Sequence, residues 1–263
     1  MYTTLKKAKE ITGSIGKPSK MPGMSYGLPA SKAEFVPHIC MAKGWPVPLQ
    51  YGCKIGGALS MVEGSVCFGC YADERGNYTY PSVQIAQTKR LVGLYHPDWV
   101  EAMTYMLEVT FDKLFKAALT NHLDDFVCNE NRMPNSAEYE DLHTMASLDT
   151  SYMRWHDSGD ILDVWHLHLI YDVVERTPFL RHWLPVQESH HVAKSNRVQP
   201  SNLLIRHSSQ MVDGPFKKRY THVSGVTTKG DYSCLASQNN NECGPCRKCW
   251  DEDTYQVTYP KHS

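Results

Sequence analysis

Seven of the nine cysteines in this chain of 263 residues fall into two short sets. Two residues between cysteines allow both thiolates of one turn to reach the same metal centre, and a bound cation stabilises the thiolate form. This spacing is typical of iron–sulfur or zinc binding, so we expect both sets to bind metal. The first cysteine set is Cys53, Cys67 and Cys70, and the second cysteine set is Cys234, Cys243, Cys246 and Cys249.

The first cysteine set offers three ligands, one fewer than a closed four-ligand site needs. Either Cys40 or Cys128 supplies the fourth ligand from a distance, or one metal position is left open for chemistry. Thiols buried only for packing are the alternative, but the surrounding glycines favour a loop folded closely around a cofactor. These glycines are Gly52, Gly56, Gly57, Gly64 and Gly69.

The second cysteine set places four cysteines within sixteen residues. Four thiolates complete either a tetrahedral zinc site or a cubane iron–sulfur cluster, and the spacing does not separate the two. A complete ligand set favours a structural or electron-relay role. Alternatively, ligands from both sets share one site, which would join the two halves of the chain.

Composition narrows the setting of these sites. A hydrophobic content of 41% is enough for one large domain or two small ones. A net charge of −1 gives no general attraction to nucleic acid or to an anionic membrane, and the short basic run at 217–219 is typical of a solvated loop. Neither an apolar run of about 18 residues nor a signal-peptide core is present. Nine cysteines in such a chain predict a reducing compartment, the cytoplasm, and metal binding instead of disulfides.

The segments that must position the sites form one expected domain in three parts. Residues 1–50 carry six prolines among residues 18–48 and predict a loop-rich, extended N-terminal arm. Residues 51–230 predict an α/β core, and residues 231–263 predict a cysteine-rich segment packed on that core. Apolar spacing predicts helices over 82–95 and 98–119, whereas the polar stretch 129–149 predicts a loop with a short helix.

Short apolar segments with polar ends follow from residue 152 onward. They predict strands at 152–156, 182–186, 203–207 and 220–226, with helices at 162–175 and 190–196 between them. Strand, polar end, helix and strand in repetition predict a parallel sheet in a partial β/α barrel. Functional groups of such sheets collect at the carboxyl ends of the strands, so we expect a pocket there. Its expected lining is His156, Ser158, Asp160, Glu188 and Arg206.

Two of these strand-end features have competing interpretations. At 158–160, Ser158 or Asp160 caps the next helix while Gly159 takes an unusual dihedral, or all three residues bind a cofactor.

We expect the carboxylates of Asp160 and Glu188 to remain solvated. The neighbouring His190 and His191 are suited to zinc, but adjacent side chains on a regular element are expected to point apart.

Five stretches resemble a bacteriophage protein family, the gene-product-eighty-eight domain family, and the resemblance runs from about residue 20 to residue 262. It implies a viral origin and a fixed set of cysteines, and it assigns no reaction. The stretches are KMPGMSYGLP at 20–29, GSVCFGCYA at 64–72, RWHDSGD at 154–160, WLPVQE at 183–188 and CGPCRKCW at 243–250.

A more distant resemblance is to radical SAM enzymes, which are partial β/α barrels. Three cysteines after the first strand of those enzymes hold a [4Fe–4S] cluster with one open iron for S-adenosylmethionine. The stretch 67–72 is similar to the end of that motif, and residues 158–160 lie where a glycine motif contacts the cofactor. The chain departs from the family in its first spacing, because thirteen residues instead of three separate Cys53 from Cys67.

We therefore expect a phage-encoded iron–sulfur protein in the host cytoplasm, with one or two [4Fe–4S] clusters. The leading hypothesis is an enzyme whose open iron faces the strand-end pocket and an unknown small-molecule substrate. The iron would act either on S-adenosylmethionine or as the Lewis acid of a hydrolase or lyase. The alternative is a non-catalytic zinc or iron–sulfur module that binds a host protein or nucleic acid.

Overall fold

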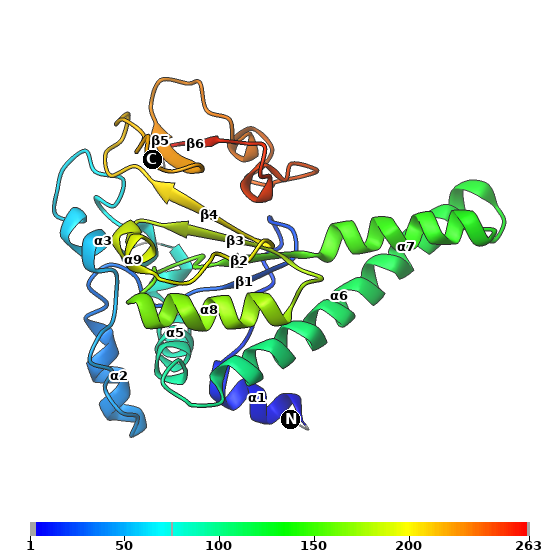
Figure 1. Cartoon of the computed structure of the whole chain (residues 1–263). Coiled ribbons are helices and arrows are strands. Elements are labelled where there is room, and N and C mark those ends of the chain that lie inside the picture. The colour runs from blue at the N-terminus through cyan, green and yellow to red at the C-terminus, as the bar shows by residue number, and fades with distance from the viewer. Residues whose placement is uncertain (1–3, 75, 262–263) are drawn as a thin grey trace.

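The computed structural model describes residues 4–74 and 76–261, and its centre is a sheet of six parallel strands (Figure 1). The strands follow one another across the sheet in chain order. Within the described residues the two edge strands do not pair with each other, so the sheet is open, and the predicted α/β class and parallel sheet are confirmed. The strands are β1 (Met24–Tyr26), β2 (Tyr152–Trp155), β3 (Arg181–Val186), β4 (Leu203–Ser208), β5 (Val223–Thr227) and β6 (Gln256–Pro260).

Helices and short helical turns connect the strands. The α-helices are α1 (Leu5–Thr12), α2 (Phe35–Lys43), α3 (Lys54–Leu59), α4 (Tyr71–Glu74), α5 (Pro81–Gly93), α6 (Trp99–Glu130), α7 (Ser136–Thr150), α8 (Val164–Arg176) and α9 (Ser189–Lys194). The 3-10 turns are η1 (Gly76–Thr79), η2 (Ala236–Gln238) and η3 (Lys248–Trp250). Among the described helices, none is both long and apolar enough to cross a membrane.

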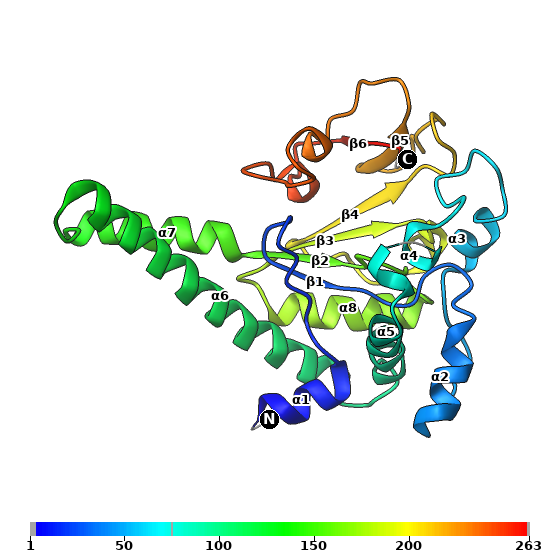
Figure 2. The same ribbon diagram turned by 180° about the vertical axis from the view of Figure 1, so that it is seen from behind.

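Helices α5, α6 and α8 cover one face of the sheet, which we call the helix face (Figures 1 and 2). Side chains of a strand alternate between the two faces, so Met153 and Trp155 of β2 enter the main hydrophobic core on the helix face. Tyr152 points the other way and packs on the opposite face, which we call the open face. The same alternation applies to β4, where it decides on which face of the sheet the predicted site residue Arg206 lies.

The C-terminal segment lies on the open face. The ring of Trp250 in η3 packs against the rings of Tyr152 and Trp183 at centroid distances of 5.2 and 5.1 Å. Its indole N–H donates a hydrogen bond to the backbone carbonyl of Met153 at 3.1 Å. Three aromatic rings therefore attach this segment to β2 and β3.

The N-terminal fifty residues contain more regular structure than we predicted. Helices α1 and α2 and the edge strand β1 interrupt the loops, and Met24 and Tyr26 are fully buried in the core. Both helices are short, at eight and nine residues, and each ends at a glycine with positive φ, Gly13 or Gly44. Residues 1–3, 75 and 262–263, which belong to the predicted arm, core and C-terminal segment, lie outside the described residues.

The stretch 129–149 is wrongly predicted as a loop with a short helix. Helix α6 continues to Glu130, and α7 returns beside it as a second long helix, so that the pair projects from the body of the molecule (Figures 1 and 2). Asn131 ends α6 in the left-handed conformation (φ 52°), and Asn135 and Glu138 form a capping box that starts α7. This cap outweighs the low apolar content of the stretch.

Candidate metal centres

The first cysteine set lies beyond the carboxyl ends of β3 and β4. Cys53 is the N-cap residue of α3, and Cys67 and Cys70 belong to the turn that leads into α4, at the same edge of the sheet (Figure 2). The Cys53 N–H donates to the Ser31 carbonyl at 2.9 Å, and the Val66 N–H donates to the Gln210 carbonyl at 2.9 Å. The loop that carries these thiols is therefore bonded to the segment after β1 at one end and to the segment after β4 at the other.

Two thiols of the first cysteine set converge on the backbone of Gly56. A side-chain carbon built on Gly56 would lie 3.7 Å from the sulfur of Cys53 and 3.7 Å from the sulfur of Cys67, and only 2.9 Å from the Cys53 Cβ. Glycine is thus the residue that fits here, because any larger residue would enter the space between the thiols. Cys70 lies close enough to both that its charge affects their pKa values. The structure therefore brings the three predicted ligands together.

Burial favours the protonated form of two thiols in the first cysteine set. Burial raises the pKa of Cys53 well above its usual range, and burial also raises the pKa of Cys67 to about 11. The side-chain amide of Gln187 lies 4.0 Å from the Cys67 sulfur and partly offsets that rise. A metal ion bound here would displace the thiol protons, so its binding would depend on pH.

Neither predicted source of a fourth ligand joins the first cysteine set. Cys40 is fully buried in the hydrophobic core on α2, and Cys128 is exposed near the outer end of α6. The nearby carboxylates belong to Glu188 and Asp160.

The expectation that Asp160 and Glu188 remain solvated is wrong. Asp160 is 4% exposed and Glu188 is 0% exposed. The Asp160 carboxylate accepts backbone N–H bonds from Ile161 (2.7 Å), Gln187 (2.6 Å) and Glu188 (3.1 Å). It therefore fixes the ends of β2 and β3 to each other, and burial raises its pKa to about 7.

The turn at 158–160 has a structural role for each residue. The Ser158 hydroxyl donates to the Leu28 carbonyl at 2.9 Å and accepts from Gln87 at 2.7 Å. Gly159 has φ 77°, as predicted, and a Cβ there would lie 2.8 Å from the Leu28 carbonyl oxygen. The expected capping by Ser158 or Asp160 is wrong, because α8 begins at Val164 with Asp163 as its N-cap.

His156 is a buried histidine in a strained conformation. Its φ of 56° is unusual for a residue other than glycine and costs about 1–3 kcal/mol. Its ring lies 5.3 Å from the ring of His166, and neither of its ring nitrogens has a hydrogen-bond partner among the described residues. Burial lowers the pKa of His156 well below its ordinary value, so the imidazole is neutral.

A group of side chains that could hold a metal ion lies at this edge, and the sequence reasoning considered its two histidines as zinc ligands but favoured the view that they point apart. Glu188, His190 and His191 each place one ligand atom within 4.8 Å of the other two. The distance from Glu188 Oε2 to His190 Nδ1 is 3.7 Å. The expectation that the two histidines point apart is wrong, because their ring centroids are 3.8 Å apart. The pattern Glu-Ser-His-His directly after a strand was the signal in the sequence.

The second cysteine set lines one cavity of about 380 Å³ on the open face of the sheet. Gly244 has φ 52° and forms the tight turn between Cys243 and Cys246, and the Arg247 guanidinium closes that turn by donating to the Gly244 carbonyl at 2.6 Å. The hydroxyl of Tyr259 lies 3.4 Å from the Cys249 sulfur. All four cysteines of the set therefore line the same cavity.

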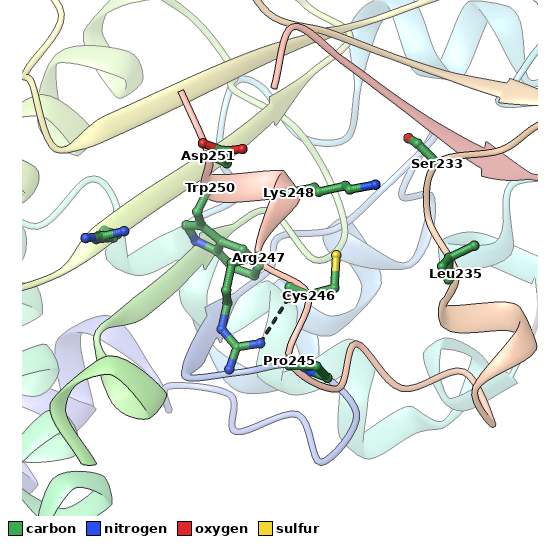
Figure 3. A pocket seen from close by; sticks show the side chains of 9 residues that line it. Ser233, Leu235, Pro245, Cys246, Arg247, Lys248, Trp250 and Asp251 are labelled. Carbon is green, nitrogen blue, oxygen red and sulfur yellow. Dashed lines mark hydrogen bonds between the residues drawn. The ribbon is translucent and has the colours of Figure 1, made fainter. Parts of the chain in front are cut away.

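A neighbouring cavity of about 550 Å³ shares the wall of the second cysteine set (Figure 3). Cys246 belongs to the lining of both cavities. In Figure 3 the Lys248 side chain extends toward Ser233, whereas the Arg247 guanidinium lies beside Pro245.

Arg206 is not part of a strand-end pocket, which corrects our prediction. Its neighbour Ile205 on β4 points into the main core on the helix face. Because side chains alternate along a strand, Arg206 points to the open face. It is fully buried, and its five N–H groups are matched by five backbone carbonyls of the C-terminal segment at 2.7–3.4 Å. The carbonyls belong to Lys248, Cys249, Asp251, Thr254 and Tyr255.

The two cysteine sets form two places and not one shared site. The first cysteine set lies at the carboxyl edge beside Glu188, whereas the second cysteine set lies on the open face beside Arg154 and Tyr259. The fold and these two places define an open-sheet α/β protein with one cysteine-lined centre at the strand ends and one under the C-terminal segment.

The family model described as Gene product 88 matches residues 2–252 of the chain. The chain therefore belongs to the Gene product 88 family of bacteriophage proteins. No curated protein and no solved structure matches it.

Proposed function

We propose that the protein is an iron–sulfur enzyme whose first cysteine set holds a [4Fe–4S] cluster with one open iron. The observation that carries this proposal is the convergence of Cys53 and Cys67 beside Gly56, with Cys70 nearby. Three thiolates leave one iron of a cubane without a protein ligand. An open iron supplies Lewis-acid chemistry to a bound small molecule, which is the chemistry of a hydrolase or lyase.

The spacing of the sulfurs favours a cluster over a single zinc ion. Four thiolates at about 2.3 Å from one zinc lie roughly 3.8 Å from each other. Among residues 4–74 and 76–261, the group of three side chains with ligand atoms within 4.8 Å of one another contains no cysteine. A cubane binds each thiolate at a different iron atom, and so it accommodates more widely separated sulfurs.

The position of the cysteines in the fold also supports this proposal. They follow β1, the Ser158-Gly159-Asp160 turn follows β2, and both lie at the carboxyl edge of a parallel sheet. Radical SAM enzymes, which the sequence distantly resembles, place their cluster and a glycine motif in the same order. The side chains of Ser158 and Asp160 are bonded within the protein, however, so they offer less to an S-adenosylmethionine amino group than we predicted. We therefore favour Lewis-acid chemistry over radical chemistry.

The second cysteine set has a different proposed role. Its four thiols complete a ligand set inside a cavity on the open face, beneath a segment that Arg206 and Trp250 attach to the sheet. We assign it a second cluster that stabilises this segment, because the sulfur spacing that disfavours a single zinc ion applies here too. A purely structural metal centre of this kind would also be present if the protein were a non-catalytic binding module.

The test is the electron paramagnetic resonance spectrum of the protein, purified without oxygen and reduced, before and after adding cyanide or S-adenosylmethionine. Cyanide binds an iron that lacks a protein ligand, so we expect it to shift the spectrum. A Cys246→Ser variant is the matched control and should keep the response. An iron–sulfur spectrum that neither probe changes would contradict the open iron, and a shift with S-adenosylmethionine would move the assignment to radical chemistry.

A further inference from the structure

The group of Glu188, His190 and His191 contains buried polar atoms that the fold leaves without hydrogen-bond partners. Glu188 Oε2, His190 Nδ1 and both ring nitrogens of His191 have none among the described residues. Glu188 is 0% exposed and His191 is 7% exposed. Burying such groups without a partner costs free energy, and a bound ligand is the usual compensation.

Hydrogen bonds inside the protein fix one end of this group. The other carboxylate oxygen, Glu188 Oε1, accepts from the backbone N–H groups of Ile55 and Gly56 at the start of α3. Oε2 is thereby held in place and faces the two imidazoles. Glu188 is the N-cap residue of α9, and both histidines lie in its first turn.

An ion pair between Glu188 and a protonated His190 does not account for the whole group. It would use one nitrogen at 3.7 Å and would leave both nitrogens of His191 without a hydrogen bond, because the nearest other carboxylate, the half-exposed Asp163, lies 3.6 Å from His191 Nδ1. Charging both rings at a centroid distance of 3.8 Å would add repulsion. A cation shared by all three side chains satisfies the carboxylate and one nitrogen of each ring.

The geometry points to a mononuclear site in which Glu188, His190 and His191 bind one divalent transition-metal ion without a cysteine ligand, next to the first cysteine set. Bonds of about 2.0–2.2 Å place neighbouring ligand atoms roughly 3–3.6 Å apart, close to the 3.7 Å found. Two imidazoles and one carboxylate suit zinc or iron(II). Three protein ligands leave further positions open, and His190, with a side chain 34% exposed, connects the site to solvent. Such a site is of the catalytic type.

The test measures zinc bound per chain and its affinity by competition with a coloured chelator, on the full protein purified without oxygen. We expect His191→Gln and His190→Gln each to weaken binding of one zinc ion at least tenfold. His143→Gln, which changes an exposed histidine on α7, is the control and should bind as the wild type does. If His191→Gln fails to fold, the zinc affinity of His190→Gln still tests the proposal, because the His190 side chain is partly exposed.

Cys67→Ser separates this site from the iron–sulfur proposal. That variant should lose the iron and sulfide of the strand-end cluster while the histidine-dependent zinc ion remains. Equal zinc affinity in the wild type and both histidine variants would overturn the mononuclear site, whatever the iron content. Loss of the zinc ion in Cys67→Ser but not in the histidine variants would overturn it as well, because the zinc would then belong to the thiols.

Discussion

Arg206 should be the residue that attaches the C-terminal segment, and Arg206→Lys tests this directly. The guanidinium places five N–H donors on five carbonyls, whereas a lysine ammonium has three donors at most. At least two of these five hydrogen bonds are therefore lost, although the carbonyls of Lys248, Asp251 and Tyr255 keep a backbone N–H donor. Each lost hydrogen bond to a charged donor costs about 1.5–3 kcal/mol, so we expect the unfolding free energy to fall by about 3–6 kcal/mol.

The assay is urea unfolding followed by tryptophan fluorescence, with iron and zinc content measured on the same samples. Arg176→Lys, an exposed change on α8, is the matched control and should stay within about 0.5 kcal/mol of the wild type. We also expect Arg206→Lys to lose metal from the second cysteine set to a chelator faster than the control does. Equal stability of the two variants would refute the reasoning, because Arg206 would then be neither buried nor saturated as described.

Two further predictions concern the C-terminal segment and the strand-end turn. Truncation after Ser233 removes β6 and Trp250 and uncovers Tyr152 and Trp183, so the truncated protein should aggregate and melt at a lower temperature; unchanged melting would show an independent tail. Burial raises the pKa of Asp160 from 3.8 to about 7, so its contribution to stability is fully present below about pH 3.8 and is lost as the pH rises through 7. The unfolding free energy of the wild type should therefore fall between these pH values more steeply than that of Asp160→Asn, and parallel curves would refute the raised pKa.

The middle of the fold follows from local patterns in the sequence. Strands β2, β3 and β4 combine apolar runs with polar ends, and α8 has a clear apolar stripe, so their positions are predicted within about two residues. Strands β1 and β6 were missed. β1 has three residues, and both are edge strands whose pairing comes from the rest of the sheet and not from their own composition.

The site was predictable in its residue types and less so in its geometry. Spacing was enough to bring Cys53, Cys67 and Cys70 together at the strand ends. Arg206 was predicted to line the strand-end pocket because it lies near the end of its strand. That prediction did not consider that side chains alternate between the two faces, and the alternation puts Arg206 on the open face. The contact between His190 and His191 depends on rotamers in the first turn of α9, which no sequence pattern specifies.

The most direct test of the central claim is the iron, acid-labile sulfide and zinc content of four proteins purified without oxygen: the wild type, Cys67→Ser, Cys246→Ser and Cys128→Ser. Because the two cysteine sets lie in separate places, Cys67→Ser should lose the strand-end cluster and keep the metal of the second set. Cys246→Ser should show the reverse loss, and Cys128→Ser, an exposed change on α6, should match the wild type. A wild-type protein without iron and sulfide, or a Cys67→Ser variant that keeps its full iron content, would contradict the account.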